Sequence, residues 1–243
     1  MSDPFHPLNR RDWTWQPAAL TPDYKTTGLR SPQRPLVFFE NTMSETTGPV
    51  FGHDLISDLD NNLVLNFASA GGEALGPRIA LRGRVLDENG RGVPNALIEI
   101  WQANAAGRYR HKNDGYRAPL DPNFAGCGRT ITDDSGHYVF HTVRPAPYPW
   151  PNGPNTWRPA HIHFSVFGHA FAQRLVTQMY FEGDPLIALC PIVNAVSDPG
   201  AVDHLVAKLD LEASTPMDAM AYHFDIVLRG RHATPFENHS RGV

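Results

Sequence analysis

The feature that most constrains the fold is a series of short strand-like segments, separated by turn signals, that begins at Arg78. RIALRGRVLD and NALIEIWQAN flank the turn-like ENGRG, and both alternate partly between apolar and polar residues. Later segments of this kind are residues 137–145, 161–168, 174–181 and 222–230. Because turns such as DDSG and PNGPN connect them, we predict a mainly β fold with an antiparallel β-sandwich core.

Helices are expected to be few and short, and one is predicted near residue 200. Asp198 is placed to cap it, and Pro199 suits its first position. The apolar residues that follow have the i, i+3, i+4, i+7 spacing of a helix face: Val202, Leu205, Val206 and Leu209.

Residues 1–77 differ from the rest of the chain because prolines recur in them and neither strand nor helix periodicity is sustained. Apolar residues such as Trp13, Trp15 and Phe38 make this segment too hydrophobic for a free disordered tail. We therefore predict an extended, Pro-rich N-terminal arm over 1–77 that packs on the body and on a partner subunit. A β-sandwich domain over 78–243 carries the candidate site.

Composition excludes several classes of partner. The 21 Lys and Arg residues against 25 Asp and Glu residues give a net charge of −4, so no cationic surface favours nucleic acid or anionic lipid. The N-terminal sequence lacks the apolar region of a signal peptide, and no run approaches the ~18 apolar residues of a membrane span. We expect a cytoplasmic protein that binds neither nucleic acid nor a membrane.

The densest chemical signal is PAHIHF, in which His161 and His163 lie two residues apart on a predicted strand. Side chains alternate across a strand, so both imidazoles should face one side, while Ile162 and Phe164 face the other. Two imidazoles on one face can bind a metal, but ordinary surface or core histidines fit the same spacing. More donors are needed to decide between these interpretations.

Tyrosines, rather than carboxylates, accompany the histidine pair. No Asp or Glu occurs from Arg144 to Gln178, which argues against a zinc hydrolase and against a two-His-one-carboxylate ferrous site. Tyr148 lies in the Pro-rich PAPYPWPNGPN, and Tyr109 follows a predicted strand in WQANAAGRYRHK. Such loops commonly display functional residues, although each tyrosine alone is equally compatible with a packing role.

Two phenolates and two imidazoles together would select ferric iron. A phenol with a pKa of about 10 ionises at neutral pH only beside a strong Lewis acid, and a hard anionic oxygen prefers a trivalent ion. Fe(III) with two tyrosinates and one hydroxide is electrically neutral, which a partly buried site tolerates. The donor set therefore indicates one non-haem Fe(III) per chain.

These motifs resemble those of the intradiol ring-cleaving dioxygenases. The segments WQANAAGRYRHK, PYPWPNGPNTWRPAHIHF and QMYFEGDP carry the resemblance, and LTPDYKT and SETTGP extend it into the arm. It is greatest to members that act on protocatechuate, because the helical N-terminal domain usual in catechol-cleaving members is not evident. The resemblance implies that Fe(III) is bound by Tyr109, Tyr148, His161 and His163.

The resemblance also assigns the other site residues. Arg158 and Tyr148 are implied to be catalytic, with Arg158 as the cation beside the substrate ring. Tyr24 and Arg30 match positions that meet the ring carboxylate, for which an arginine fork is well suited. The implied pocket-lining residues are Trp101, Trp150, Gln178 and Ile192.

The implied reaction is cleavage of protocatechuate (3,4-dihydroxybenzoate) by O₂ to 3-carboxy-cis,cis-muconate, in the beta-ketoadipate pathway of aromatic catabolism. The implied partner is a companion alpha chain in a hetero-oligomer. The residues themselves leave other interpretations open: catechol or hydroxyquinol as the substrate, a non-catalytic β-sandwich binding subunit, or a zinc hydrolase.

Overall fold

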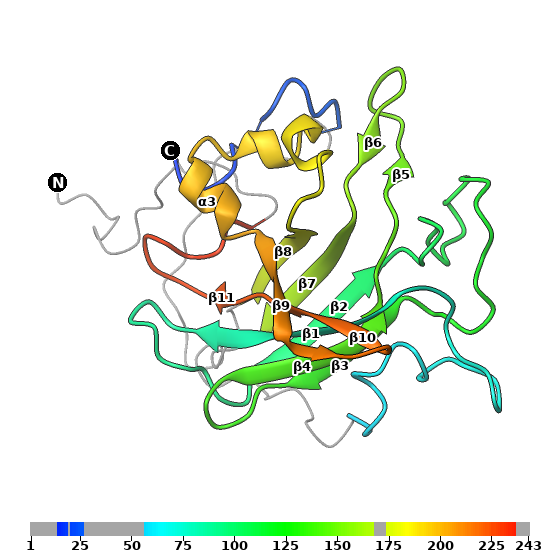
Figure 1. Cartoon of the computed structure of the whole chain (residues 1–243). Coiled ribbons are helices and arrows are strands. Elements are labelled where there is room, and N and C mark those ends of the chain that lie inside the picture. Colours follow the sequence, from blue (N-terminus) through cyan, green and yellow to red (C-terminus); the bar gives the residue numbers. More distant parts are fainter. Residues whose placement is uncertain (1–13, 19, 27–55, 168–173, 237–243) are drawn as a thin grey trace, which may run out of the picture.

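The computed structural model describes residues 14–18, 20–26, 56–167 and 174–236. Its main element is a nine-stranded sheet with the order β11-β1-β10-β9-β8-β7-β2-β3, in which β4 pairs with β1 (Figure 1). The strands of this sheet are β1 (Arg78–Leu86), β2 (Leu97–Gln102), β3 (Cys127–Ile131), β4 (His137–Val143), β7 (His161–Phe167), β8 (Arg174–Phe181), β9 (Val206–Thr215), β10 (Ala219–His223) and β11 (Ile226–Val227). A separate two-stranded ribbon joins β5 (Tyr148–Pro149) to β6 (Trp157–Arg158).

The core lies between two layers of this curled sheet. In β1 the alternate residues Ile79, Leu81 and Val85 are buried, and the alternate residues of β2, β4 and β7 join them in one cluster. Tyr138 of β4 meets Phe164 of β7 with ring centroids 6.0 Å apart, so the two layers touch. Burying each such side chain contributes roughly 1.5–3 kcal/mol. The prediction of a mainly β sandwich is confirmed.

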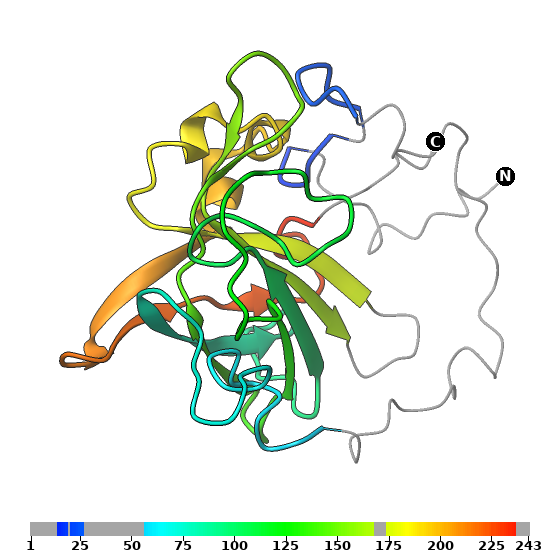
Figure 2. The same cartoon turned by 90° about the vertical axis from the view of Figure 1, so that its right-hand side faces the viewer.

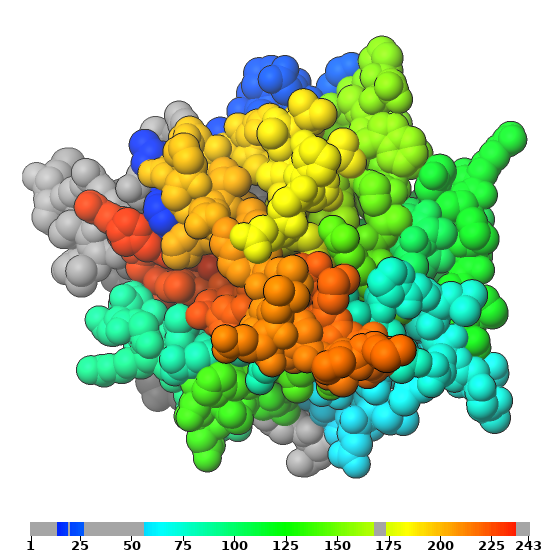
Figure 3. All heavy atoms as spheres, viewed as in Figure 1, coloured from blue at the N-terminus to red at the C-terminus, as the bar shows by residue number. Residues whose placement is uncertain are grey.

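The strand directions are more mixed than the sequence indicates. Most neighbouring strands run antiparallel, but β1 is parallel to β10 and β11, and β8 is parallel to β9. The predicted strand over 222–230 is divided into β10 and β11, since Asp225 turns its side chain to accept a hydrogen bond from the backbone N–H of Arg84 at 2.7 Å. The β9–β10 hairpin projects from the body in Figure 2, and its atoms (orange) lie on the face turned toward the viewer in Figure 3.

The helix begins at the predicted residue, but it is shorter than the spacing of apolar residues predicts. Asp198 caps α3 (Pro199–Asp203) by accepting a hydrogen bond from the N–H of Gly200 at 2.8 Å. The helix ends at Asp203, and both Val206 and Leu209 lie in β9. Pairing of β9 with β8 and β10 overrides the helical spacing. The other helices described are single 3₁₀ turns, η3 (Ile187–Leu189) and η4 (Val193–Ala195).

The described parts of the N-terminal segment contact the body. The indole N–H of Trp15 donates to the carbonyl of Ala233 at 2.8 Å, and the backbone N–H of Lys25 donates to Asn152 at 3.0 Å. Leu63, within the segment that we assigned to the arm, is fully buried in the main core. No helix in the described ranges is long and apolar enough to cross a membrane.

Candidate active site

Strand β7 provides the floor of the candidate site. It pairs with β2 on one side and with β8 on the other, and Ile162 and Phe164 point into the core. The imidazoles of His161 and His163 therefore lie on the opposite face, as the alternation predicts, with ring centroids 4.9 Å apart. The ring of His163 stacks on Trp101 of β2, with centroids 4.8 Å apart and ring planes within 5°.

His161 is held in one tautomer. Its Nδ1 lies 2.7 Å from the carbonyl oxygen of Pro159, which can only accept a hydrogen bond, so Nδ1 carries the proton. The lone pair is then on Nε2, 3.4 Å from the hydroxyl of Tyr148. His161 is 2% exposed, and this burial lowers its imidazole pKa well below the usual range, with the charge of Arg158 acting in the same direction. The ring is thus neutral and available as a ligand at neutral pH.

Two loop segments bring tyrosines over this floor. Tyr109 lies in the long connection after β2, and Tyr148 begins β5. Their rings meet edge to face with centroids 5.5 Å apart, and Tyr109 lies 6.4 Å from the ring of His163. Burial raises the pKa of Tyr148, while Arg158 and a hydrogen bond with Tyr109 act against this. Without a bound cation, Tyr148 is therefore a neutral phenol at neutral pH.

A glycine permits the close approach of the two tyrosine segments. Gly107 has φ of +81°, and a Cβ at this position would lie 2.5 Å from the carbonyl oxygen of Pro147 and 3.4 Å from the Cβ of Tyr148. A side chain here would force the two loops apart. Gly107 is not among the residues predicted from the sequence, because the approach depends on a tertiary contact.

Arg158 lies beside the four candidate metal ligands, Tyr109, Tyr148, His161 and His163, and its side chain is buried, with 5% of the residue exposed. Its Nη2 donates to the side-chain oxygen of Gln178 and contacts the hydroxyl of Tyr180 at 3.4 Å, and its guanidinium lies 5.4 Å from the ring centroid of Trp150. Burial acts to lower the pKa of Arg158, but Tyr180, Cys190 and the site tyrosines raise it above its ordinary value. The guanidinium is therefore a fixed positive charge.

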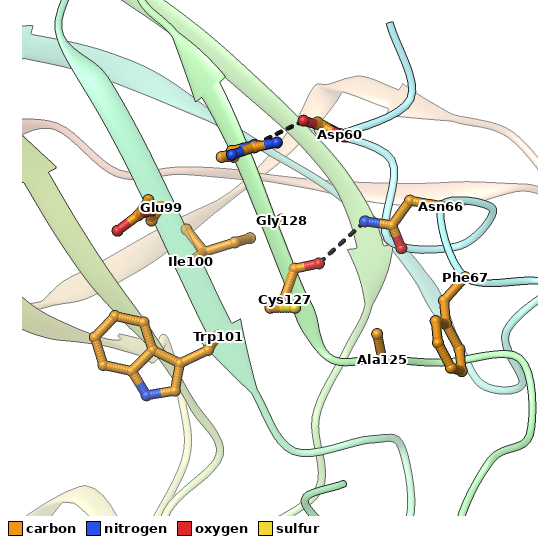
Figure 4. Close-up of a pocket in the computed structure, with 10 residues that line it drawn as sticks. Asp60, Asn66, Phe67, Glu99, Ile100, Trp101, Ala125, Cys127 and Gly128 are labelled. Carbon is orange, nitrogen blue, oxygen red and sulfur yellow. Dashed lines mark hydrogen bonds and ion pairs between the residues drawn. The ribbon is translucent and has the colours of Figure 1, made fainter. Parts of the chain in front are cut away.

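The tyrosines and His163 border an open cavity of about 900 Å³. Trp101 and Trp150 provide flat apolar walls, and the β2–β3 connection supplies the opposite side. Trp101 also borders a second cavity of about 500 Å³ beside Cys127 and Phe67 (Figure 4). The indole of Trp101 thus separates the metal-ligating candidates from this second cavity.

Two neighbours of the site were missed by sequence reasoning. The hydroxyl of Tyr180 donates to Gln178 at 3.0 Å, and the carboxylate of Asp114 accepts the backbone N–H of Tyr109 at 2.8 Å. Tyr180 lies two residues after Gln178 on β8, so the alternation was a signal that could have identified it. Asp114 is in an irregular loop, where no periodic signal exists.

The other residues predicted to bind the substrate do not all lie beside the candidate metal ligands. Tyr24 contacts Trp150, with ring centroids 5.5 Å apart. Ile192 packs in a smaller core cluster that includes Tyr180, so its link to the site is indirect. Arg30 lies outside the described residues.

The donor set fits a hard, highly charged metal ion. Within the described ranges, no three His, Cys, Asp or Glu side chains are grouped closely enough to hold a metal. The side chains beside the histidine pair that offer further oxygen ligands are those of Tyr109 and Tyr148. The 3.4 Å between Nε2 of His161 and the hydroxyl of Tyr148 is compatible with two ligands of one ion. Two imidazoles and two phenol oxygens suit Fe(III).

Most of the chain is similar in sequence to known dioxygenases. Residues 46–230 match the family model described as Dioxygenase, and residues 9–42 match the model for the N-terminal part of the protocatechuate 3,4-dioxygenase beta subunit. The chain is 51% identical over 230 residues to the protocatechuate 3,4-dioxygenase beta chain of Burkholderia cepacia, which covers 95% of this chain and 97% of that one.

More distant relatives share the same core. The alpha chain of protocatechuate 3,4-dioxygenase from Pseudomonas putida is 32% identical over 209 residues, covering 83% of this chain and 98% of that one. The crystal structure of 3-chlorocatechol 1,2-dioxygenase from Rhodococcus opacus 1CP matches with a TM-score of 0.52 and 29% identity, over 72% of this chain and 67% of that one. The chain belongs to the intradiol ring-cleaving dioxygenase family.

Proposed function

We propose that this chain cleaves protocatechuate between its two hydroxyl-bearing carbons, using O₂ and one non-haem Fe(III) and yielding 3-carboxy-cis,cis-muconate. The observation that carries the proposal is the convergence of Tyr109, Tyr148, His161 and His163. All but the buried His161 line one cavity. The 51% identity to a protocatechuate 3,4-dioxygenase beta chain supports the substrate. The similarity to an alpha chain of that enzyme supports a hetero-oligomer with a companion alpha chain.

The four donors would hold the iron, which supplies a Lewis acid that activates a chelated catechol. The histidines keep a fixed position because β7 is hydrogen-bonded on both sides. Tyr148 has a different role, since burial makes its neutral phenol the stable form away from a cation. As an iron ligand it would be a phenolate, and its burial would favour a return to the neutral phenol, so its oxygen is placed to hold one proton given up by the substrate.

Arg158 stabilises negative charge that develops on the bound catecholate. Gln178 and Tyr180 hold its guanidinium, and Trp150 covers one side of it, so the charge is preorganised and shielded from water. Tyr24 reaches Trp150 from the arm, which supports a role for the arm near the substrate. We assign the substrate carboxylate to Tyr24 and Arg30.

Oxygen uptake by the iron-loaded protein tests the proposal. We expect faster uptake with protocatechuate than with catechol, and a visible tyrosinate-to-iron charge-transfer band. Tyr109→Phe should weaken that band, because one of the two phenolates is lost. Stoichiometric zinc with no oxygen uptake would support a hydrolase instead, and a protein that stays colourless after iron loading would support a non-catalytic binding subunit.

A further inference from the structure

One peptide group connects the histidine floor of the active site to a carboxylate that the proposed function does not use. The peptide bond between Pro159 and Ala160 lies between Arg158 and the candidate ligand His161. Its carbonyl oxygen, on Pro159, accepts the hydrogen bond from Nδ1 of His161 at 2.7 Å. Its N–H, on Ala160, donates to the carboxylate oxygen Oδ2 of Asp184 at 3.0 Å. Asp184 is therefore linked to His161 through a single peptide group.

Asp184 is held in this position by its own turn. It follows β8 directly in the segment QMYFEGDP, and its second carboxylate oxygen, Oδ1, accepts the N–H of Leu186 at 2.9 Å. The carbonyl of Asp184 accepts the N–H of Ile187, the first residue of η3, at 3.2 Å. This turn, drawn in yellow, lies at the same end of the sheet as the β5–β6 ribbon (Figure 1). The carboxylate is thus a fixed acceptor for the N–H of Ala160.

The connecting peptide group is shielded from water. Pro159 and Ala160 are buried, and His161 is 2% exposed. In such surroundings hydrogen bonds are electrostatically stronger than in water, and bonds in series polarise one another. A carboxylate is a charge-assisted acceptor, so its bond to the N–H of Ala160 moves electron density toward the carbonyl oxygen of Pro159. That oxygen becomes a stronger acceptor for the Nδ1–H of His161.

We infer that Asp184 is a positioning residue that acts through the peptide group of residues 159–160, fixing the ring of His161 and making its Nε2 a stronger donor toward a metal ion. The inference rests on the proposed function, which assigns His161 to a metal. A stronger acceptor at Nδ1–H raises the basicity of a metal-ligating imidazole. A stronger donor stabilises Fe(III) more than Fe(II), because the ion of higher charge gains more from the added electron density.

The test compares Asp184→Asn with Asp121→Asn in the full chain, in the assembly in which it purifies. Both residues accept the N–H two positions ahead with one oxygen and a distant backbone N–H with the other. For Asp121 the donors are Asn123 at 2.9 Å and Leu75 at 2.6 Å. In each variant the amide oxygen can keep the local bond, while the NH₂ group cannot accept the distant one. Asp121 is not part of the described lining of the active-site cavity, so it controls for the lost hydrogen bond alone.

With iron loaded, Asp184→Asn should lower the preference for Fe(III) over Fe(II) about threefold to tenfold, less than for a direct partner of a ligand because a peptide group intervenes. That factor raises the reduction potential by about 30–60 mV, since tenfold corresponds to about 59 mV for a one-electron couple. The tyrosinate-to-iron charge-transfer band should move to longer wavelength. Asp121→Asn should lose similar thermal stability but keep the wild-type potential and band. A wild-type potential in Asp184→Asn, or equal shifts in both variants, would overturn the inference.

A measurement on the metal-free protein separates this inference from the proposed function. The nitrogen NMR spectrum of histidine-labelled protein reports the hydrogen bond at Nδ1 of His161, and the signals lost in His161→Gln identify this ring. Asp184→Asn should move the Nδ1 signal to lower chemical shift, as a weaker hydrogen bond does, and Asp121→Asn should leave it in place. This result supports the inference even if the iron-loaded wild type consumes no oxygen. If Asp184→Asn does not fold, Asp184→Glu replaces it, because the longer side chain keeps the charge but displaces the carboxylate. An unmoved Nδ1 signal in the folded variant would overturn the inference.

Discussion

The floor and the walls of the candidate active site are built in different ways. His161 and His163 stand on β7, where register pairs His163 with Trp101 on one side and with Gln178 on the other. Tyr109 and Tyr148 come from a long connection and a two-residue strand. A continuous ladder of hydrogen bonds fixes the floor, whereas a few close approaches fix the walls. Changes to the floor should therefore act on single ligands, and changes to the walls should alter the shape of the cavity.

The largest effect is expected from His161→Ala on the floor. Removing a ligand should lower iron affinity more than about 100-fold, since even changes to the partners of metal ligands cost roughly 10-fold to 100-fold. The fold should persist, because the imidazole lies on the face of β7 opposite Phe164 and the strand pairing does not use it. Iron content and thermal unfolding measure the two effects.

The matched control for His161→Ala is Ser165→Ala on the same face of β7. Ser165 is buried and accepts a hydrogen bond from Nε of Arg174 at 2.8 Å, away from the donors. Ser165→Ala should keep a full complement of iron. Stoichiometric, tightly held iron in His161→Ala would show that β7 is not the floor of a metal site.

Gly107→Ala should give the next largest effect by pushing the walls apart. The new Cβ would meet the carbonyl oxygen of Pro147 at 2.5 Å, and the positive φ adds strain of about 1–2 kcal/mol. Gly90→Ala is the control for the strain alone, because Gly90 has φ of +76° and a Cβ added there would meet nothing within 4 Å. We expect Gly107→Ala to lose more stability than Gly90→Ala and to lose the iron colour, as an absorption spectrum would record. Unchanged colour in Gly107→Ala would mean that the tyrosine loops do not need this approach.

The floor was predictable from the sequence, and the walls were predictable only in part. A period of two residues places His161 and His163 on one face whatever the rest of the fold does. The same period links Gln178 to Tyr180. The tyrosines could be selected by their chemistry and by family resemblance, but their approach depends on Gly107, whose role appears only when two distant segments meet.

The fold shows the same division between local and long-range information. The bounds of β8, Arg174–Phe181, agree with the prediction, because a short segment rich in apolar and β-branched residues can be recognised locally. The helix start at Pro199 follows from local capping. Val206 and Leu209 are in a strand rather than a helix because β9 pairs with β8 and β10, and no local sequence pattern predicts that pairing. The parallel pairing of β1 with β10 joins residues far apart in the chain, so it was also beyond local reasoning.

Asp114→Asn should have a smaller effect on the wall than Gly107→Ala. With asparagine at this position, the amide oxygen can still accept the N–H of Tyr116. The amide NH₂ group, however, takes the place of the oxygen that accepts the N–H of Tyr109 at 2.8 Å, and it cannot accept that hydrogen bond. Losing one such hydrogen bond costs about 1 kcal/mol, and the position of Tyr109 should become less defined. We expect retained iron with a shifted charge-transfer band.

Asp133→Asn is the control for Asp114→Asn. Asp133 also accepts two backbone N–H groups, from Ser135 and His137, but in a turn away from the cavity. It should change stability without moving the absorption band. A band shift of equal size in both variants would refute a local role for Asp114.

The smallest effect is expected at Asp60, which pairs with Arg129 of β3 at 2.7 Å beside the second cavity (Figure 4). The hydrogen bond from Arg129 is the largest influence that lowers the pKa of Asp60, so ionised Asp60 stabilises the fold above its unfolded-state pKa of about 3.9. Asp60→Asn should therefore lower the free energy of unfolding by about 0.5–1 kcal/mol at pH 7. This difference should disappear as the pH falls through the lowered pKa, because wild-type Asp60 is then protonated as well. Denaturant unfolding at pH 7 and at a pH below the lowered pKa of Asp60 measures this difference in the free energy of unfolding. Asp58→Asn, at an exposed position, is the control. A pH-independent difference would contradict the ion pair, and a change in iron content would contradict the separation of this part of the sheet from the active-site walls.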